Sequence, residues 1–171
     1  MVSKLNGMNT STVLLTGDNK MTADYFASQV GISEIRAELL PEQKVENIVS
    51  LQKDERKVCM IGDGVNDAPA LKTADVGVAM GSMGSDIAVE AADIALMSDD
   101  ISKIPYLKRL SNATVKTIKF SITLSMCINF LAVALSVLGV LNPTTGALVH
   151  NAGSCFVVLI AAMLYDRKFD K

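Results

Sequence analysis

Two long uncharged segments in the second half of this 171-residue chain constrain its fold more than any other feature. Residues 120–141 and residues 144–165 each form a run of 22 residues without a charged side chain. At a rise of about 1.5 Å per residue, a helix of that length crosses the hydrocarbon core of a bilayer. Two buried helices of a soluble domain are the alternative, although core helices are usually shorter. We therefore expect a transmembrane hairpin that turns at Asn142 and Pro143.

Charge is divided unevenly along the chain. Residues 1–105 carry 9 basic and 16 acidic side chains, net −7, whereas residues 106–171 carry 7 basic and 2 acidic ones, net +5, which together give the formal charge of −2. We therefore expect an acidic globular domain in residues 1–105, followed by a basic juxtamembrane helix in residues 106–119. We expect no nucleic-acid partner.

Basic residues flank both outer ends of the expected hairpin, and none lies in its connecting loop. The positive-inside rule therefore places residues 1–119 and the tail 166–171 in the cytosol, with the Asn142 loop outside. This distribution predicts a multi-pass protein of the cell membrane.

Strands and helices alternate in the acidic part. Short β-prone runs predict strands at Thr12–Leu15, Glu34–Leu39, Val58–Ile61, Val76–Met80 and Ile94–Met97. Helical spacing predicts helices at residues 20–30, where Met21, Tyr25, Phe26 and Val30 recur, at residues 41–52 and at residues 85–92. Such alternation predicts an α/β fold with a parallel, doubly wound sheet. The stretch Gly81 to Asp86 is interpreted as a structural turn, because it lacks the ending of a P-loop.

The segment K-V-C-M-I-G-D-G-V-N-D-A-P-A-L-K, residues 57–72, combines a strand with a polar loop. Its apolar run is typical of a parallel strand buried on both faces. Asp63, Asn66 and Asp67 then follow at the carboxyl end, where α/β sheets bind ligands, and oxygen donors of this kind suit Mg²⁺ and a phosphoryl group. Asn66 can cap the next helix, whose first turn accepts Pro69. A plain surface turn is the alternative for G-D-G alone.

Two further features are consistent with a phosphate site. The first strand ends in T-G-D-N, residues 16–19, where Asp18 or Asn19 can cap the following helix. A simple capped turn is the alternative for this segment. Lys44 lies in the first turn of the helix that begins P-E-Q-K, although an isolated helical lysine is usually only a solvated charge.

The string G-D-G-V-N-D-A-P-A-L-K closely resembles the Mg²⁺-binding motif of P-type ATPases, which are phosphotransferases of the haloacid-dehalogenase superfamily. From Thr12 to Asp166 the chain resembles the carboxyl-terminal part of a heavy-metal-transporting member, which implies a partial Rossmann-like phosphorylation domain and the last two membrane helices. The resemblance implies Mg²⁺ as cofactor, with ATP used by the complete pump. It implies these roles: Thr16, Gly17 and Asp18 in the phosphate loop, Lys44 as the phosphate-binding cation, Asp63 and Asp67 at Mg²⁺, and Asn66 as a supporting contact.

The resemblance also implies parts that these 171 residues do not contain. The chain has no D-K-T-G-T sequence, so the aspartate that the family phosphorylates is missing. We therefore expect this chain alone to be inactive and to require the missing amino-terminal part of the pump as its partner. Two alternatives remain: a non-catalytic membrane protein whose degenerate domain binds Mg²⁺ or a partner, and a self-contained phosphatase.

Polar residues inside the second uncharged segment are the remaining chemical signal. His150 begins H-N-A-G-S, which resembles the H-E-G-G-T sequence of a cobalt-related branch, with Asn151 in place of the acidic residue. Imidazole is a good ligand for Zn²⁺, Co²⁺ and related ions, so we expect His150 to contact the transported transition or heavy-metal cation. A hydrogen bond at the outer membrane surface is the alternative role for this histidine.

Overall fold

The computed structural model describes the chain except for residues 54–55, 64, 81–85, 98–99 and 166–171. The turn expected from Gly81 therefore falls largely outside the described residues, as do Gly64 of the G-D-G string and the tail. The chain divides into two compact units, Met1–Pro105 and Tyr106–Lys171, and each is considered by itself.

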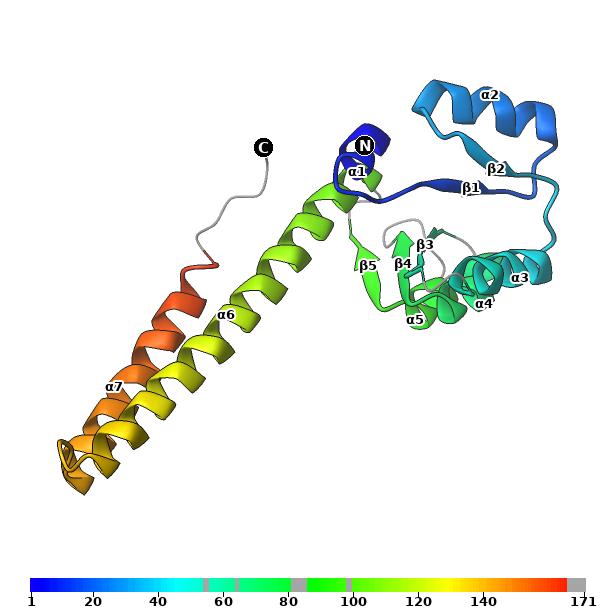
Figure 1. The fold of residues 1–171 in the computed structure, drawn as a ribbon. Helices are drawn as coiled ribbons and strands as arrows, with labels where there is room; N and C mark the ends of the chain where they lie inside the picture. Colours follow the sequence, from blue (N-terminus) through cyan, green and yellow to red (C-terminus); the bar gives the residue numbers. More distant parts are fainter. Residues whose placement is uncertain (54–55, 64, 81–85, 98–99, 166–171) are drawn as a thin grey trace. The chain divides into compact units, whose positions relative to one another are not determined.

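The first unit is built from short parallel strands and the helices that connect them (Figure 1). Its strands are β1 (Val13–Leu15), β2 (Glu34–Arg36), β3 (Cys59–Gly62), β4 (Val76–Met80) and β5 (Ile94–Leu96). Its helices are α1 (Val2–Asn6), α2 (Lys20–Val30), α3 (Pro41–Gln52), η1 (Val65–Asp67), α4 (Ala68–Thr73), α5 (Asp86–Ala91) and η2 (Ile101–Lys103). The predicted alternation of strand and helix is confirmed, with α2 and β4 at their predicted bounds.

The strands form two parallel sheets instead of the single predicted sheet. One sheet has the order β1-β2 and the other has the order β3-β4-β5. In the described part of the chain no strand pairs with both β1 and β3, so each of these strands ends its sheet. The helix α3 connects the two sheets, because it follows β2 in the chain and its Ile48 is fully buried with Met60 of β3.

Strand β4 lies at the centre of the core. Successive side chains of a strand point to opposite faces, and here both faces are covered. Ala79 packs in one cluster with Ile48, Met60 and the α4 residues Ala70 and Leu71. Val78 packs in a second cluster with Leu5 of α1 and with Ile104. Burial on both faces explains why V-G-V-A-M is apolar throughout.

The burial of α2 was not predicted from the sequence, and the predicted burial of Cys59 is wrong. Helix α2 buries Ala23 and Ala27, whereas the larger residues at helical spacing, such as Met21 and Tyr25, are exposed. Small side chains allow a helix to approach its sheet closely, so alanines occupy the inner face here. Cys59, expected in a doubly buried strand, is exposed because β3 is the terminal strand of its sheet.

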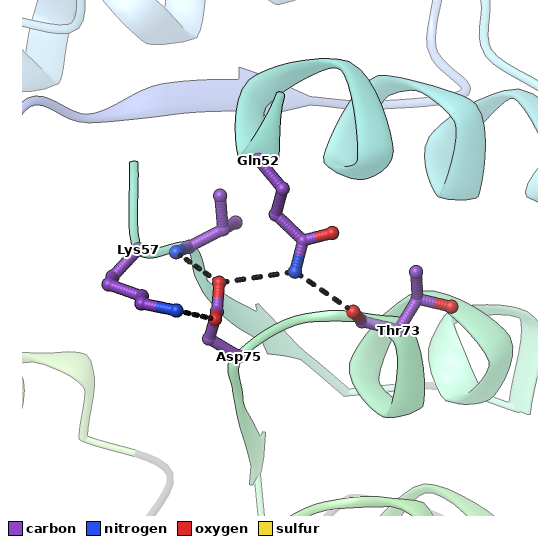
Figure 2. A network of polar contacts seen from close by, with 5 residues as sticks. Gln52, Lys57, Thr73 and Asp75 are labelled. Atoms are coloured by element: carbon purple, nitrogen blue, oxygen red, sulfur yellow. Dashed lines mark hydrogen bonds and ion pairs between the residues drawn. The ribbon is translucent and has the colours of Figure 1, made fainter. Parts of the chain in front are cut away.

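A hydrogen-bond network around Asp75 closes the amino-terminal end of β3 and β4 (Figure 2). The Asp75 carboxylate accepts hydrogen bonds from the Val58 N–H at 3.0 Å, from Lys57 Nζ at 2.9 Å and from Gln52 Nε2 at 3.1 Å. Gln52 Nε2 also donates to the Thr73 carbonyl at 3.2 Å. The pKa of Asp75 lies far below its usual range. The hydrogen bond from the Val58 N–H lowers it most, and those from Lys57 and Gln52 lower it further. One carboxylate therefore links the end of α3 to the starts of two strands.

The second unit is a helical hairpin (Figure 1). It contains α6 (Ile104–Val137), which begins at the end of the first unit, and α7 (Pro143–Ala162). Both are long and apolar enough to cross a membrane, judged by length and composition. The basic segment 106–119 and the first apolar segment form one continuous helix, which ends at Val137 instead of Leu141. With 34 residues, α6 is about 50 Å long and exceeds the thickness of a hydrocarbon core.

Candidate functional site

The loop after β1 is closed on itself by short hydrogen bonds. Thr16 Oγ1 donates to Asp18 Oδ2 at 2.9 Å, and the Asp18 N–H donates to Thr16 Oγ1 at 3.1 Å. Asn19 is the residue that caps α2, since its side chain accepts the Thr22 N–H at 2.9 Å. The predicted phosphate loop therefore precedes a capped helix amino terminus, where backbone N–H groups favour an anion.

The same loop is attached to the segment that leads into α3. The Leu39 N–H donates to the Thr16 carbonyl at 3.0 Å, and the Glu38 N–H donates to the Asp18 carbonyl at 2.9 Å. Glu38 has a φ of 59°, an uncommon value for a residue other than glycine. A Cβ at Gly17 would lie 3.3 Å from the Leu39 carbonyl oxygen, so the loop and this segment approach closely. The loop therefore fixes the position at which α3 begins.

Lys44 lies on the first turns of α3 and forms an ion pair with Asp67. Its Nζ is 2.7 Å from Asp67 Oδ1, and the two side chains are only 15% and 13% exposed. A charge-assisted hydrogen bond in such a partly buried place is stronger than a pair at the surface. The structure therefore brings together two predicted site residues that are 23 positions apart in the sequence.

Gly62, the last residue of β3, allows Asp67 to occupy this position. A Cβ at Gly62 would lie 2.8 Å from Asp67 Cβ and 3.0 Å from Asp67 Oδ2. Any larger residue would displace the aspartate or the strand. The predicted close approach of the backbone at Gly62 is thus directed at the carboxylate of the site.

Asp63 and Asn66 lie beside this pair and are exposed. In the described part of the chain neither side chain makes a hydrogen bond or an ion pair, so their oxygens are available to a ligand. Asn66 does not cap α4 as predicted: it lies within the turn η1, and Asp67 takes the N-cap position without a capping hydrogen bond. Pro69 does lie in the first turn of α4.

The donor chemistry at this end of β3 fits Mg²⁺. Asp63 and Asp67 supply carboxylate oxygens, which this hard cation prefers, and Asn66 supplies an amide oxygen. Among the described residues, no cluster of three or more His, Cys, Asp or Glu side chains is assembled as a metal site. A Mg²⁺ ion at this place would therefore complete its coordination with water or substrate oxygens, as this ion usually does.

The predicted residues form two groups in the first unit. One group is the loop of Thr16, Gly17 and Asp18, and the other is Lys44 with Asp67 and its neighbours Asp63 and Asn66. Within the described residues no hydrogen bond joins the groups directly. They are connected through the backbone from Leu39 to Lys44, because the loop holds the start of the helix that carries the lysine.

His150 lies in the other unit, within α7, and it has a partner that the sequence did not reveal. Its Nδ1 is 2.9 Å from Oδ1 of Asn129 on α6. Asn129, like His150, is a polar residue inside an uncharged, largely apolar segment. Their pairing depends on the register of two helices, which the spacing along one helix cannot show.

Comparison with known proteins identifies relatives of both units. Residues 1–75 match the family model of haloacid dehalogenase-like hydrolases. A cadmium-transporting ATPase of Staphylococcus aureus is 44% identical over 160 residues, covering 94% of this chain and 22% of the relative. A copper-exporting P-type ATPase of Bacillus subtilis (strain 168) is 42% identical over 167 residues, covering 98% of this chain and 21% of the relative.

The crystal structure of a zinc-transporting PIB-type ATPase resembles this chain with a TM-score of 0.89 at 35% identity, covering 95% of this chain and 26% of that one. The predicted fold, a haloacid-dehalogenase-like α/β part followed by two apolar helices, is therefore confirmed. The chain spans about a fifth of the length of the curated relatives that it matches.

Proposed function

We propose that this chain, which is homologous over most of its length to the carboxyl-terminal part of heavy-metal-exporting P-type ATPases, supplies the phosphate and Mg²⁺ residues and two membrane spans of an ATP-driven metal exporter. The observation that carries this proposal is the Lys44–Asp67 ion pair, held against Gly62 beside the exposed Asp63. It gives a positive charge and several oxygen donors at the carboxyl end of one parallel strand, where α/β sheets bind their ligands.

The residues take their roles from their chemistry. Lys44 offsets negative charge on a transferring phosphoryl group, while the N–H groups around Gly17 bind its oxygens. The Thr16 hydroxyl donates to Asp18 here, and it would bind a phosphoryl oxygen after rotating away from that carboxylate. Asn66 is a supporting contact to the phosphoryl group. The aspartate that receives the phosphoryl group would come from the amino-terminal part of the pump, which is the principal partner of this chain.

Mg²⁺ would be held by Asp63 and Asp67. When bound, it neutralises negative charge on the phosphoryl group during transfer. In the absence of the metal, Lys44 holds the Asp67 carboxylate in place through their 2.7 Å hydrogen bond. ATP would be the phosphoryl donor in the complete pump.

The membrane part of the proposal concerns topology and cargo. Helices α6 and α7 would span the cell membrane with residues 1–119 and the tail in the cytosol, because basic residues flank both outer ends of the hairpin. The cargo would be a transition or heavy-metal cation, which His150 contacts. The relatives are named for different metals, so their names do not select one ion for this chain.

The phosphorylation half of the proposal is tested with labelled ATP. Purified alone, this chain should form no acyl-phosphate, because covalent catalysis requires its nucleophile. The complete pump should form one, and Asp63→Ala should abolish it, whereas Asp24→Ala, on the exposed face of α2, should not. Phosphoenzyme on the isolated chain, or equal loss in both variants, would contradict the proposal and favour a non-catalytic or self-contained domain.

Topology is tested by labelling single cysteines in intact cells after the three native cysteines are replaced by serine. A Thr144→Cys thiol should react with an impermeant reagent, and a Lys53→Cys thiol should react only after the cells are opened. The reverse pattern would reject the orientation.

A further inference from the structure

His150 is the only histidine in the chain, and its ring is hydrogen-bonded across the hairpin. Nδ1 of His150 on α7 is 2.9 Å from the carboxamide oxygen Oδ1 of Asn129 on α6. Both residues lie within the apolar spans. A polar group in hydrocarbon is costly without a partner, and this hydrogen bond satisfies one polar atom of each side chain.

Gly153 brings the two helices close enough for this contact. It lies three residues after His150, so both face the same side of α7. A Cβ at Gly153 would lie 2.9 Å from Cγ2 of Ile128, the residue that precedes Asn129. A side chain at this position would push α6 away from α7. The absence of a side chain at Gly153 therefore supports the Asn129–His150 hydrogen bond.

The hydrogen bond determines where the imidazole proton resides. A carboxamide oxygen only accepts hydrogen bonds, so Nδ1 of His150 must carry the hydrogen. A neutral imidazole has a single N–H, and its other nitrogen, Nε2, is then left with a free lone pair. Nε2 is separated from Nδ1 by the ring carbon Cε1, and its lone pair points in a different direction from the Nδ1–H that Asn129 accepts.

We propose that Asn129 is a positioning residue that fixes His150 as its Nδ1–H tautomer and so presents Nε2 as the nitrogen that can bind a divalent transition-metal cation. The role of the cation rests on the proposed function, whereas the tautomer rests only on the Asn129–His150 geometry. Asn129 thereby acts on the metal through the histidine. A hydrogen bond to the second ring nitrogen commonly sets the orientation and basicity of a histidine ligand.

Nitrogen NMR of the full chain tests the tautomer directly. The chain is labelled with ¹⁵N in the histidine ring and studied in detergent micelles at a pH where the imidazole is neutral. One histidine gives one pair of ring signals, so no assignment is needed. We expect the signature of a protonated Nδ1 and an unprotonated Nε2. A protonated Nε2 in the unaltered chain would overturn the proposal.

Matched variants separate positioning from general disturbance. Asn129→Leu removes the acceptor at similar volume and should abolish the Nδ1–H signature, whereas Asn151→Leu, beside the histidine on α7, should preserve it. Gly153→Val should have the same effect as Asn129→Leu by separating the helices. Gly146→Val in α7, where a Cβ would meet nothing within 4 Å, should leave the Nδ1–H signature unchanged. Circular dichroism confirms that each hairpin remains helical. An unchanged signature in both Asn129→Leu and Gly153→Val would overturn the proposal.

Zn²⁺ alone serves as the probe for the metal. In the unaltered chain it should shift the Nε2 signal and leave Nδ1 protonated, and a shift that deprotonates Nδ1 would overturn the assignment. If the tautomer is as expected but Zn²⁺ changes neither signal, the tautomer stands and the contact of His150 with the cargo fails. In the complete pump, Asn129→Leu should raise the metal concentration for half-maximal ATPase stimulation by about 10-fold to 100-fold, with little change in kcat.

Discussion

The two ends of strands β3 and β4 each carry an aspartate in an ion pair with a lysine, yet the two aspartates are bound very differently. At the amino-terminal end, Asp75 accepts a backbone N–H, an amide N–H and the Lys57 ammonium. At the carboxyl end, Lys44 is the one hydrogen-bond partner of the Asp67 side chain in the described part of the chain, and the aspartate packs against Gly62. The first carboxylate accepts three donors, whereas the second retains an oxygen that no donor among the described residues reaches.

This difference distinguishes a structural carboxylate from a candidate functional one. A carboxylate with several fixed donors cannot take a further ligand without losing hydrogen bonds. A carboxylate with one lysine partner can accept a cation or face a phosphoryl group, because the lysine side chain is flexible and can move to the incoming anion. Exposure alone would give the wrong assignment, since Asp75 is the more exposed of the two.

The largest expected effect comes from removing Asp67, the aspartate at the carboxyl end. In the complete pump, Asp67→Ala should lower phosphoenzyme formation by about 100-fold or more, because it removes both a proposed Mg²⁺ donor and the partner of Lys44. Asp75→Ala should leave the activity of the folded protein nearly unchanged. Labelled ATP measures the phosphoenzyme, and circular dichroism measures the folded fraction. Equal loss per folded molecule would mean that the two ends do not differ in function.

Stability should show the opposite order. At neutral pH, Asp75→Asn should lower the thermal unfolding midpoint of the first unit more than Asp67→Asn does. The pKa of Asp75 is depressed in the folded state, so its stabilisation is fully present above the unfolded value near 3.8 and is lost as the pH falls below it. The difference between the unaltered chain and Asp75→Asn should therefore shrink below that pH. A difference in unfolding midpoint that stays constant with pH, or that also appears for Asp24→Asn, would contradict this role of Asp75.

Two glycines, one in each strand, separate loss of stability from loss of activity. Gly62→Ala places a Cβ against Asp67, and Gly77→Ala places one 2.7 Å from the Leu71 carbonyl oxygen, so each should cost about 1–3 kcal/mol of unfolding free energy. Only Gly62→Ala should also reduce phosphoenzyme formation, because only it displaces a site residue. Urea titration measures the first effect and labelled ATP the second. Comparable loss of activity in Gly77→Ala would assign both effects to general destabilisation.

The sequence predicts local structure well where residues within or next to a single strand or helix determine its bounds. Strand β4 and helix α2 occur at their predicted bounds, because an apolar run fixes the strand, and Asn19 and Gly31 delimit the helix. Gly31 adopts φ 78°, the left-handed conformation that ends helices at glycine. Apart from Lys44, which lies on a helix, the candidate site residues of the first unit were predicted from motifs at the ends of strands, and their roles stay predictions.

Contacts between elements could not be predicted in the same way. The Lys44–Asp67 pair and the Asp75 network join residues 17 to 23 positions apart, and the Asn129–His150 pair joins residues 21 apart. Whether residues so far apart in the sequence meet depends on how the helices and strands pack, and no local sequence pattern encodes that packing. The division into two sheets was missed for the same reason, because periodicity identifies strands but not their neighbours.

The smallest expected effects distinguish the donors to Asp75. Gln52→Met should cost about 1 kcal/mol of unfolding free energy, because Gln52 Nε2 bonds both Asp75 and the Thr73 carbonyl and so joins α3 to α4. Lys57→Met should change the midpoint of urea unfolding much less, since the Lys57 side chain is 87% exposed and water and salt screen its charge. Raising the salt concentration should remove what remains of the Lys57 effect and leave that of Gln52. If Lys57→Met proved the more damaging change, charge rather than the shared amide would hold the amino-terminal end of the strands together.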